Sequence, residues 1–274
     1  MAKKNLLKVL FVFTGILSIL GGFSNEANAF HGRAWRFCCD PCSFSYSPSE
    51  NIVPSCSVPQ ESFTERPAPQ ASMYIHGETV SLFNGKDLAG WRNVKGDKPN
   101  PNWTVENGLL FRKANGGDLY SEKKYENFIL EFDVKIVKGG NSGVKYKSWN
   151  TSGFGLGCEF QVEDVPTGKT AARYRTGGLY DVYEPQTDPS VFRSGEFNHG
   201  KIIVIGNHIE HWLNGQKTVS AEIGSYDWFC RIKKSKYADV KEYGMVRYGR
   251  LLLQDHGNDV WYKNITITEL QPVY

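Results

Sequence analysis

From about Tyr74 onward, apolar and polar residues alternate along the chain, and turn residues recur roughly every ten positions. Alternation with a period of two is typical of a β-strand with one buried face, because successive side chains point to opposite sides. No window carries an apolar stripe at helical spacing over several turns, so long helices are not expected. The pattern predicts an all-β domain over residues 74–274, folded as a two-layer antiparallel β-sandwich.

The most regular alternation lies between Asn127 and Val137, where Glu131, Asp133 and Lys135 separate apolar neighbours. Gly206-Asn207 and Asn214-Gly215 are residue pairs typical of tight hairpin turns. The other predicted strands cover residues 142–149, 158–163, 201–205, 208–213, 216–221, 251–254 and 260–269. These short strands with frequent turns are consistent with a sandwich.

The N-terminal residues 1–29 have a different character. Lysines at positions 3, 4 and 8 precede an apolar run over residues 9–20, and Ala27-Asn28-Ala29 forms a small-x-small cleavage site. The apolar run is too short to be a stable membrane anchor. We therefore predict a signal peptide cleaved near Ala29 and an exported protein, periplasmic or secreted, without a stable membrane span.

Residues 30–73 are rich in Cys, Pro and Ser and have no periodicity. Such a segment buries too little apolar surface to offset chain entropy, so it is predicted to be a largely irregular tether. Its cysteines are Cys38, Cys39, Cys42 and Cys56. In an oxidising compartment they are expected to form disulfides, within the tether or with a partner. Zinc held by these cysteines with His31 is the alternative, although the usual paired CxxC arrangement is missing. Cys158 and Cys230 are candidates for a disulfide inside the sandwich.

Charge and composition narrow the class of partner. The formal net charge is +3, and removing residues 1–29 leaves 29 of 32 basic and 28 of 29 acidic residues, a balance of +1. Nucleic-acid binding would require a concentrated basic surface, so it is not expected. Aromatic residues make up 14% of the chain. They suit strands and also sugar-binding surfaces, so the composition is consistent with both roles.

Two polar clusters are candidates for chemistry. In the strand 158–163, three residues point inward, and Glu159, Gln161 and Glu163 project together from the opposite face, which we expect to be solvated. The polar segment 254–259 follows an apolar run and contains His256. Its near-neutral ordinary pKa makes His256 a candidate base.

The spacing of Glu159, Gln161 and Glu163 superficially resembles the strand motif of laminarinase-type glycosidases. Retaining hydrolysis needs two carboxyl groups about 5 to 5.5 Å apart. Residues four apart on a regular strand are about 13 Å apart at Cα. Gln161 cannot supply the intervening acid, so a hydrolytic glucanase is the weaker interpretation.

An ordered set of motifs resembles the 3-keto-disaccharide hydrolase family, whose members fold as concanavalin-like jelly rolls. The matching residues lie between about 78 and 271. The motifs are residues 82–88 with Gly90-Trp91, Asn141-Ser142-Gly143, Glu159-x-Gln161-x-x-Asp164, residues 176–181, 195–198, 211–215 and 253–257, and Asn264-Ile265. Two positions depart from the family pattern, because Lys147 and Lys263 stand where arginine is usual. Lysine keeps the charge but loses the planar donor fork.

The resemblance implies hydrolysis of glycosides already oxidised at C3. A C3 ketone acidifies the hydrogen on C2, so a base can form an enolate that expels the C1 substituent, and water then adds. Glu159 or His256 would be the base and the other the acid, with Lys147 and Lys263 stabilising the enolate. A divalent metal held by Glu159 and His256 is an alternative electrophile, and no other cofactor is required. The groups expected to orient the sugar are Asn141, Gln161, Asp164, Tyr180 and Gln254.

Two other functions fit the same pattern. The first is a non-catalytic carbohydrate-binding module, in which tryptophans stack on sugar rings. The candidates for this role are Trp91, Trp103, Trp149 and Trp212. The second is an envelope structural protein cross-linked through the cysteine-rich tether.

Overall fold

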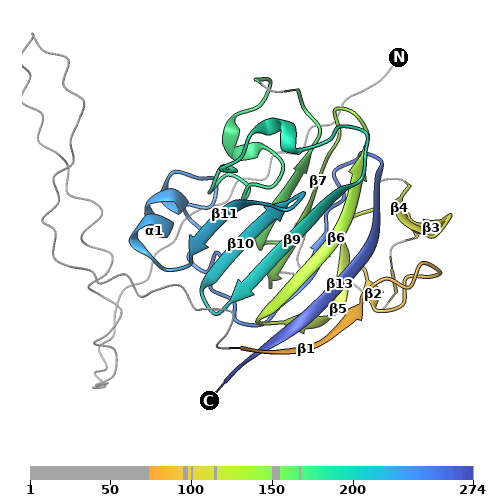
Figure 1. Ribbon diagram of the computed structural model, residues 1–274, viewed down its shortest axis with the longest axis horizontal. Coiled ribbons are helices and arrows are strands. Elements are labelled where there is room, and N and C mark those ends of the chain that lie inside the picture. Colours follow the sequence, from red (N-terminus) through yellow and green to blue (C-terminus); the bar gives the residue numbers. More distant parts are fainter. Residues whose placement is uncertain are drawn as a thin grey trace, which may run out of the picture. The chain divides into compact units, whose positions relative to one another are not determined.

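The structure is a computed structural model that describes residues 74–94, 98–99, 101–113, 116–149, 155–166 and 168–273. The predicted signal peptide and tether, with the four tether cysteines and His31, lie outside these residues. The described chain forms two antiparallel sheets packed face to face (Figure 1). The predicted all-β sandwich is confirmed.

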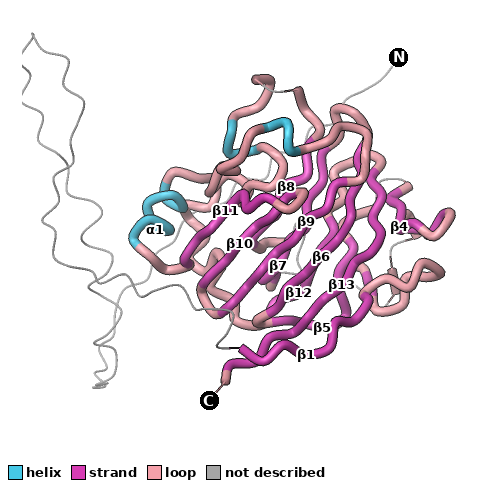
Figure 2. The backbone as a smooth tube through the Cα atoms, in the orientation of Figure 1, coloured by secondary structure: helices cyan, strands magenta, loops and turns pink. Residues whose placement is uncertain are grey.

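The larger sheet has eight strands in the order β11-β10-β9-β6-β13-β4-β3, and β1 pairs with the C-terminal half of β13. The bounds are β1 Tyr74–Ser81, β3 Trp103–Glu106, β4 Leu109–Arg112, β6 Phe128–Ile136, β9 Asn198–Ile205, β10 His208–Leu213, β11 Gln216–Glu222 and β13 Val260–Pro272. Figure 2 shows these strands lying side by side across one layer.

The smaller sheet has five strands in the order β2-β5-β12-β7-β8. The bounds are β2 Trp91–Arg92, β5 Leu119–Tyr125, β7 Asn141–Ser148, β8 Cys158–Glu163 and β12 Gly249–Leu253. Strands far apart in sequence are neighbours here, since β12 lies between β5 and β7. This topology places the polar segment 254–259, which follows β12, beside Asn141 and Gly143 in the first residues of β7.

The core lies between the two sheets and is built from the inward row of each strand. Phe132 of β6 meets Phe160 of β8 edge to face, with ring centroids 5.4 Å apart. Two polar contacts join the sheets across the core. The Tyr262 hydroxyl lies 3.0 Å from Ser142 Oγ, and the Tyr146 hydroxyl lies 2.8 Å from Nε2 of His211. Burial lowers the pKa of His211 to about 3, so it is a neutral core residue.

Several strand predictions are confirmed closely. Strand β8 has the predicted bounds, and β6 differs by one residue at each end. Both predicted hairpins form, β9 with β10 and β10 with β11. Asn214 and Gly215 have φ values of 47° and 82°. Tight hairpin turns need positive φ at both central positions, and Asn and Gly tolerate this conformation better than other residues.

The sequence pattern did not predict α1 (Tyr226–Lys233), which follows β11. Ser225 caps it by accepting a hydrogen bond from the Trp228 N–H at 3.1 Å, and Asp227 lies in its first turn, where a negative charge is favourable. Two 3₁₀ turns, η2 (Ala172–Tyr174) and η3 (Pro189–Val191), interrupt the connection from β8 to β9. Figure 1 shows α1 beside β11.

Cys158 and Cys230 are both unpaired, so the disulfide considered between them is not formed. Cys158 lies in the core, where burial raises the pKa of its thiol to about 12. Cys230 lies on α1 and is only partly buried. No helix in the described residues is both long and apolar enough to cross a bilayer.

Candidate functional site

The outer face of the small sheet, which points away from the core, brings together polar residues of β7 and β8 beside Leu252 of β12. Leu252 of β12 pairs with Lys145 of β7, and Lys145 pairs with Glu159 of β8. Two residues along each strand, on the same face, Gly143 pairs with Gln161. Side chains paired across a sheet point to the same face. The register therefore places Lys145, Glu159 and Gln161 side by side.

The Glu159 carboxylate lies against the backbone of β7 because position 143 is a glycine. A Cβ atom on Gly143 would be 2.6 Å from Glu159 Oε1. Lys145 Nζ lies 3.6 Å from the other oxygen, Glu159 Oε2, and donates to the Gly155 carbonyl at 3.3 Å. Because Gly143 has no side chain, there is space for the ion pair of Glu159 and Lys145 to lie directly against the backbone of β7.

This ion pair is buried, with Glu159 2% and Lys145 7% exposed. The expectation that the Glu159 face is solvated is therefore wrong. Burial raises the pKa of Glu159, because a charged carboxylate loses its hydration, and the positive charges of Lys145 and then Lys236 act in the opposite direction. A carboxylate with a raised pKa is a stronger base than an ordinary glutamate.

Two side-chain amides lie on either side of Gly143. Gln161 is 1% exposed, and its Nε2 donates to Asn141 Oδ1 at 3.2 Å. Gln254 follows β12, and its backbone N–H donates to the Gly143 carbonyl at 2.9 Å. The Oε1 atoms of both glutamines are buried without a hydrogen-bond donor among the described residues. Because buried acceptors normally find a donor, these two oxygens are placed to accept from hydroxyl groups of a ligand.

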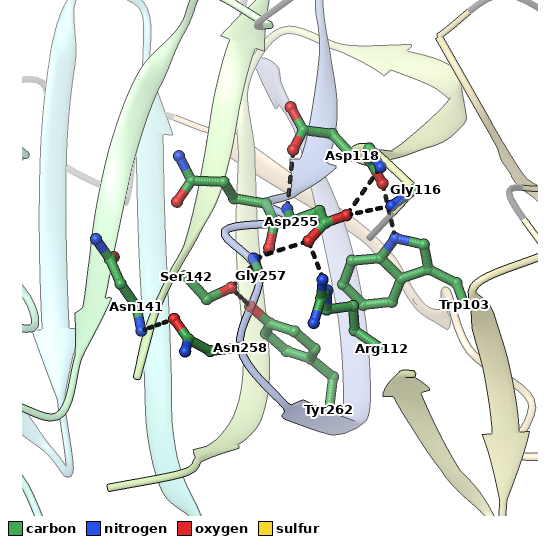
Figure 3. A network of polar contacts seen from close by, with 12 residues as sticks. Trp103, Arg112, Gly116, Asp118, Asn141, Ser142, Asp255, Gly257, Asn258 and Tyr262 are labelled. Atoms are coloured by element: carbon green, nitrogen blue, oxygen red, sulfur yellow. Dashed lines mark hydrogen bonds and ion pairs between the residues drawn. The ribbon is translucent and has the colours of Figure 1, made fainter. Parts of the chain in front are cut away.

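Asp255 anchors the loops at this end of the sheet (Figure 3). Its carboxylate accepts from Arg112 Nε at 2.5 Å and from the backbone N–H groups of Gly116, Gly117 and Gly257 at 2.7 to 3.0 Å. Burial alone would raise the pKa of Asp255, but these donors together lower it, so it stays ionised. Asp255 is a structural anchor of the site.

Asp118 is held by the same network, because its Oδ1 accepts the Asp255 backbone N–H at 2.8 Å (Figure 3). Burial raises the pKa of Asp118, and the charge of Lys145 partly opposes this. Asp118 and Glu159 are thus two carboxylates that both interact with Lys145.

The connection after η2 runs along the free edge of β8 and covers the site from that side. The Gly177 N–H donates to the Gln161 carbonyl at 3.0 Å, and the Tyr180 N–H donates to the Glu159 carbonyl at 3.0 Å. Tyr180, which the resemblance assigned to orienting the sugar, therefore lies beside Glu159. Burial and then the Glu159 charge raise the pKa of its phenol. Lys145, Glu159 and Gln161 form a buried floor, and Tyr180, Gln254, Asn141 and Asp118 form a half-buried rim.

The two lysines that the sequence analysis assigned to the enolate do not lie at this floor. Lys147 has a φ of 51°, which breaks the alternation of β7, and its Nζ donates to the Val246 carbonyl at 3.0 Å. Burial lowers its pKa. Lys263 belongs to the other sheet, where its Nζ lies 4.3 Å from the centre of the Phe197 ring. The expected convergence of Lys147 and Lys263 with Glu159 is not observed.

Asp164 and His256 lie at the end of the floor. Asp164 Oδ2 accepts from Ser194 Oγ at 2.7 Å, so this carboxylate holds a loop. His256 is exposed in the turn after β12, and its charge acts on Glu163, whose pKa is raised mainly by burial. On a regular strand, Glu163 is about 13 Å from Glu159 at Cα. His256 thus lies near the far end of β8.

The structure also bears on the other candidates. In the described residues, no group of three or more His, Cys, Asp and Glu side chains is arranged to hold a metal ion. His256 lies at the Glu163 end of β8, so the expected convergence of Glu159 and His256, as acid and base or as metal ligands, is not observed. Trp91 and Trp103 are core residues, each 2% exposed. Trp212 lies on the outer face of the large sheet between Lys201 and Lys217, and Trp149 is partly buried.

Sequence reasoning missed Lys145, Asp118 and Lys236. Lys145 could have been found, because alternation along β7 places it on the same face as Asn141 and Gly143. Asp118 and Lys236 carry no such signal, since each lies outside a strand in a loop that only the fold brings to the site.

Comparisons with known proteins give the family of this chain. Residues 78–268 match the family of 3-keto-alpha-glucoside-1,2-lyase-like domains. A 3-keto-disaccharide hydrolase of Bacteroides thetaiotaomicron is 28% identical over 228 residues, which cover 70% of this chain and 78% of that protein. A provisionally named glycosyl hydrolase of Parabacteroides distasonis has a crystal structure that is 33% identical with a TM-score of 0.63, covering 72% of this chain and 94% of that one.

A second provisionally named glycosyl hydrolase of P. distasonis is 25% identical with a TM-score of 0.56, covering 70% of this chain and all of that one. The family match covers more than half of the chain and includes Glu159, Gln161 and Lys145. This chain belongs to the family of 3-keto-alpha-glucoside-1,2-lyase-like domains.

Proposed function

We propose that this protein hydrolyses 3-keto-glycosides, including 3-keto-disaccharides, by elimination followed by addition of water. The observation that carries the proposal is the buried Glu159 carboxylate on Gly143, paired with Lys145 and flanked by the unpaired amide oxygens of Gln161 and Gln254. This arrangement combines a strong base, a positive charge and acceptors for sugar hydroxyls.

In the first step, Glu159 removes the proton from C2 of the 3-keto sugar, and the C–H electron pair forms an enolate with its charge on the C3 oxygen. Lys145 lies beside the base, where its ammonium group stabilises that oxygen. A fixed positive charge in a site shielded from water stabilises a developing anion more strongly than it would in solution.

In the second step, the enolate collapses, the bond from C1 to the leaving oxygen breaks, and a double bond forms between C1 and C2. Water then adds its oxygen to C1, and C2 regains a proton. Glu159, protonated in the first step, exchanges this proton with solvent while the leaving group departs and is then positioned to protonate C2. The net result is hydrolysis of the glycosidic bond.

Binding specificity arises from the amides and from Tyr180. The Oε1 atoms of Gln161 and Gln254 accept from hydroxyl groups of the ring, and Tyr180 at the rim packs against it. A ligand lacking these hydroxyls would leave both buried oxygens unpaired, which costs about 1 to 3 kcal/mol each. His256 and Glu163, farther along β8, are placed to meet the second unit of a disaccharide.

We also propose that the protein acts outside the cytoplasm after cleavage near Ala29. This rests on the basic and apolar residues before Ala27-Asn28-Ala29. Expression of the full-length chain, followed by cell fractionation and N-terminal sequencing, tests it. A mature protein that begins at Phe30 and is found outside the cytoplasm is expected, and a cytoplasmic protein that keeps Met1 or Ala2 would contradict it.

The activity is tested by incubating the purified protein with a 3-keto-glucoside in D₂O and with the same glucoside before oxidation. Elimination followed by hydration predicts that only the oxidised substrate is cleaved and that the released 3-keto sugar carries deuterium at C2. The free 3-keto sugar incubated without protein corrects for spontaneous exchange. Cleavage without deuterium would show direct hydrolysis. Binding of both glucosides without turnover would favour a carbohydrate-binding module.

A further inference from the structure

Lys236 brings a second positive charge to the floor from a part of the chain that no motif of the family resemblance includes. It follows α1, and its Nζ lies 4.2 Å from the centre of the Tyr180 ring and 5.1 Å from that of Tyr237. Its charge acts on Glu159. Lys236 is exposed and lies over the ring of Tyr180, whose backbone N–H donates to the carbonyl of Glu159, the residue proposed as the base.

The position of Lys236 is fixed by its backbone and by the packing of its segment. Its N–H donates to Asp181 Oδ2 at 2.7 Å. The neighbouring Tyr237 stacks on Tyr243 with ring centroids 4.1 Å apart, and Tyr243 stacks on Trp228 of α1 at 5.9 Å. Because the hydrogen bond to Asp181 and the stacking of Tyr237 fix this backbone, they limit where the Lys236 side chain can place its ammonium group. This favours a defined role in the site over a lysine that only contributes surface charge.

The Lys236 ammonium group lies against the rings of Tyr180 and Tyr237. The charges that act on it are those of Glu159 on β8, Lys145 on β7 and Asp181 in the covering segment. Burial lowers the pKa of Lys236, the Glu159 carboxylate opposes this, and Lys145 acts in the same direction as burial. Although this side chain is exposed, its lowered pKa means that its proton is released more easily than that of a lysine with the ordinary pKa.

We propose that Lys236 is the general acid that protonates the leaving oxygen when the C1–O bond breaks. The inference rests on the proposed function. As the enolate collapses, the electron pair of the C1–O bond goes to the leaving oxygen, which takes a proton from the ammonium group and departs as an alcohol. Lys236 is left as a neutral amine, and water restores its proton before the next turnover.

Leaving groups of different acidity test this role. Wild type, Lys236→Met and Lys236→Arg are compared on methyl 3-keto-glucoside, whose leaving group needs a proton, and on 4-nitrophenyl 3-keto-glucoside, whose leaving group does not. Lys236→Met should lose about 10²-fold or more in kcat on the methyl substrate and less than about threefold on the nitrophenyl substrate. Lys236→Arg should not rescue the methyl substrate, because a guanidinium keeps its proton.

Lys241→Met, in an exposed position of the same segment, controls for loss of a lysine, and thermal unfolding of each variant controls for folding. An equal loss on both substrates, no loss, or full rescue by arginine would overturn the role of Lys236 as an acid while leaving the hydrolase proposal intact. Failure of wild type to cleave either 3-keto substrate would overturn the proposed function and this inference together.

Discussion

The outer faces of the two sheets have the same kind of sequence but opposite surroundings. On β6, Glu131 and Asp133 alternate with core residues, as Glu159 and Gln161 do on β8. The Glu131 side chain is 37% exposed and pairs with Lys201 at 3.3 Å, whereas the Glu159 side chain is 3% exposed. Polar alternation therefore marks a face that points away from the core, but it does not show whether water reaches that face.

The difference comes from what covers each face. The connection between β8 and β9 pairs with the free edge of β8 and places Tyr180 beside Glu159. The large sheet instead carries ion pairs with partly exposed side chains, such as His199 with Asp133 at 2.9 Å. Charges shielded from water interact more strongly than exposed ones, so the small sheet is the face suited to chemistry.

The carboxylates of the two faces also titrate in opposite directions. Burial raises the pKa of Glu159. On the large sheet, hydrogen bonds with His208, Lys217 and Trp212 lower the pKa of Glu210 to about 2. A raised pKa suits the base proposed for Glu159, and a lowered pKa suits an anion that stabilises the fold.

The largest expected effect is that of Glu159→Gln. Glutamine keeps the shape but cannot accept the C2 proton, so kcat/KM on a 3-keto-glucoside should fall by about 10²- to 10⁴-fold. The matched control is Glu131→Gln on the large sheet, which should keep wild-type kinetics. If both variants had equal activity, the small sheet would not be the catalytic face.

The next largest expected effect is that of Lys145→Met on the free energy of unfolding. It leaves the Glu159 carboxylate buried without its partner, which is expected to reduce the free energy of unfolding by about 3 to 5 kcal/mol at neutral pH. Lys201→Met removes an exposed partner of Glu131 and should cost less than about 1 kcal/mol. Urea unfolding of both variants measures the difference. Equal losses would mean that the two ion pairs are equally shielded.

Gly143→Ala should reduce activity about 10²-fold with little change in fold, because the new Cβ would displace the Glu159 carboxylate. Gly200→Ala on β9 is the counterpart, since its Cβ would lie 2.4 Å from the Phe132 ring in the core. That variant should lower the melting temperature and keep kcat in the protein that remains folded. If Gly143→Ala kept its activity and Gly200→Ala kept its melting temperature but lost kcat, the placement of Glu159 over Gly143 would be wrong.

The smallest expected effect is that of Glu210→Gln. A carboxyl group with a lowered folded-state pKa contributes stability above its ordinary pKa of 4.5 and loses it as the pH falls toward about 2. The variant should therefore be less stable than wild type by about 1 kcal/mol at pH 7, because partial exposure screens the charges, and the difference should shrink at pH 3. Thermal unfolding at both pH values, with the exposed Glu184→Gln as control, measures it. A difference independent of pH would exclude the charge as its cause.

The alternation within each strand was sufficient to predict the β-sandwich, the bounds of β8 and the Asn-Gly hairpin. These features depend on local geometry, since side chains alternate between faces and Asn and Gly tolerate positive φ. Gln161, Glu159 and Tyr180 were also found in this way or through the motif resemblance. The helix α1 was missed, because one short helix makes too little periodic pattern.

The sequence by itself determined which residues of each strand face away from the core. Only the tertiary structure decided that Lys145 pairs with Glu159, that Lys147 turns aside through its positive φ, and that Lys263 lies on the other sheet. Asp118 and Lys236 reach the same floor from loops separated by more than a hundred residues. Contacts between residues so far apart in sequence depend on strand order and on the packing of the covering segments. These are long-range properties that no local pattern of residues encodes.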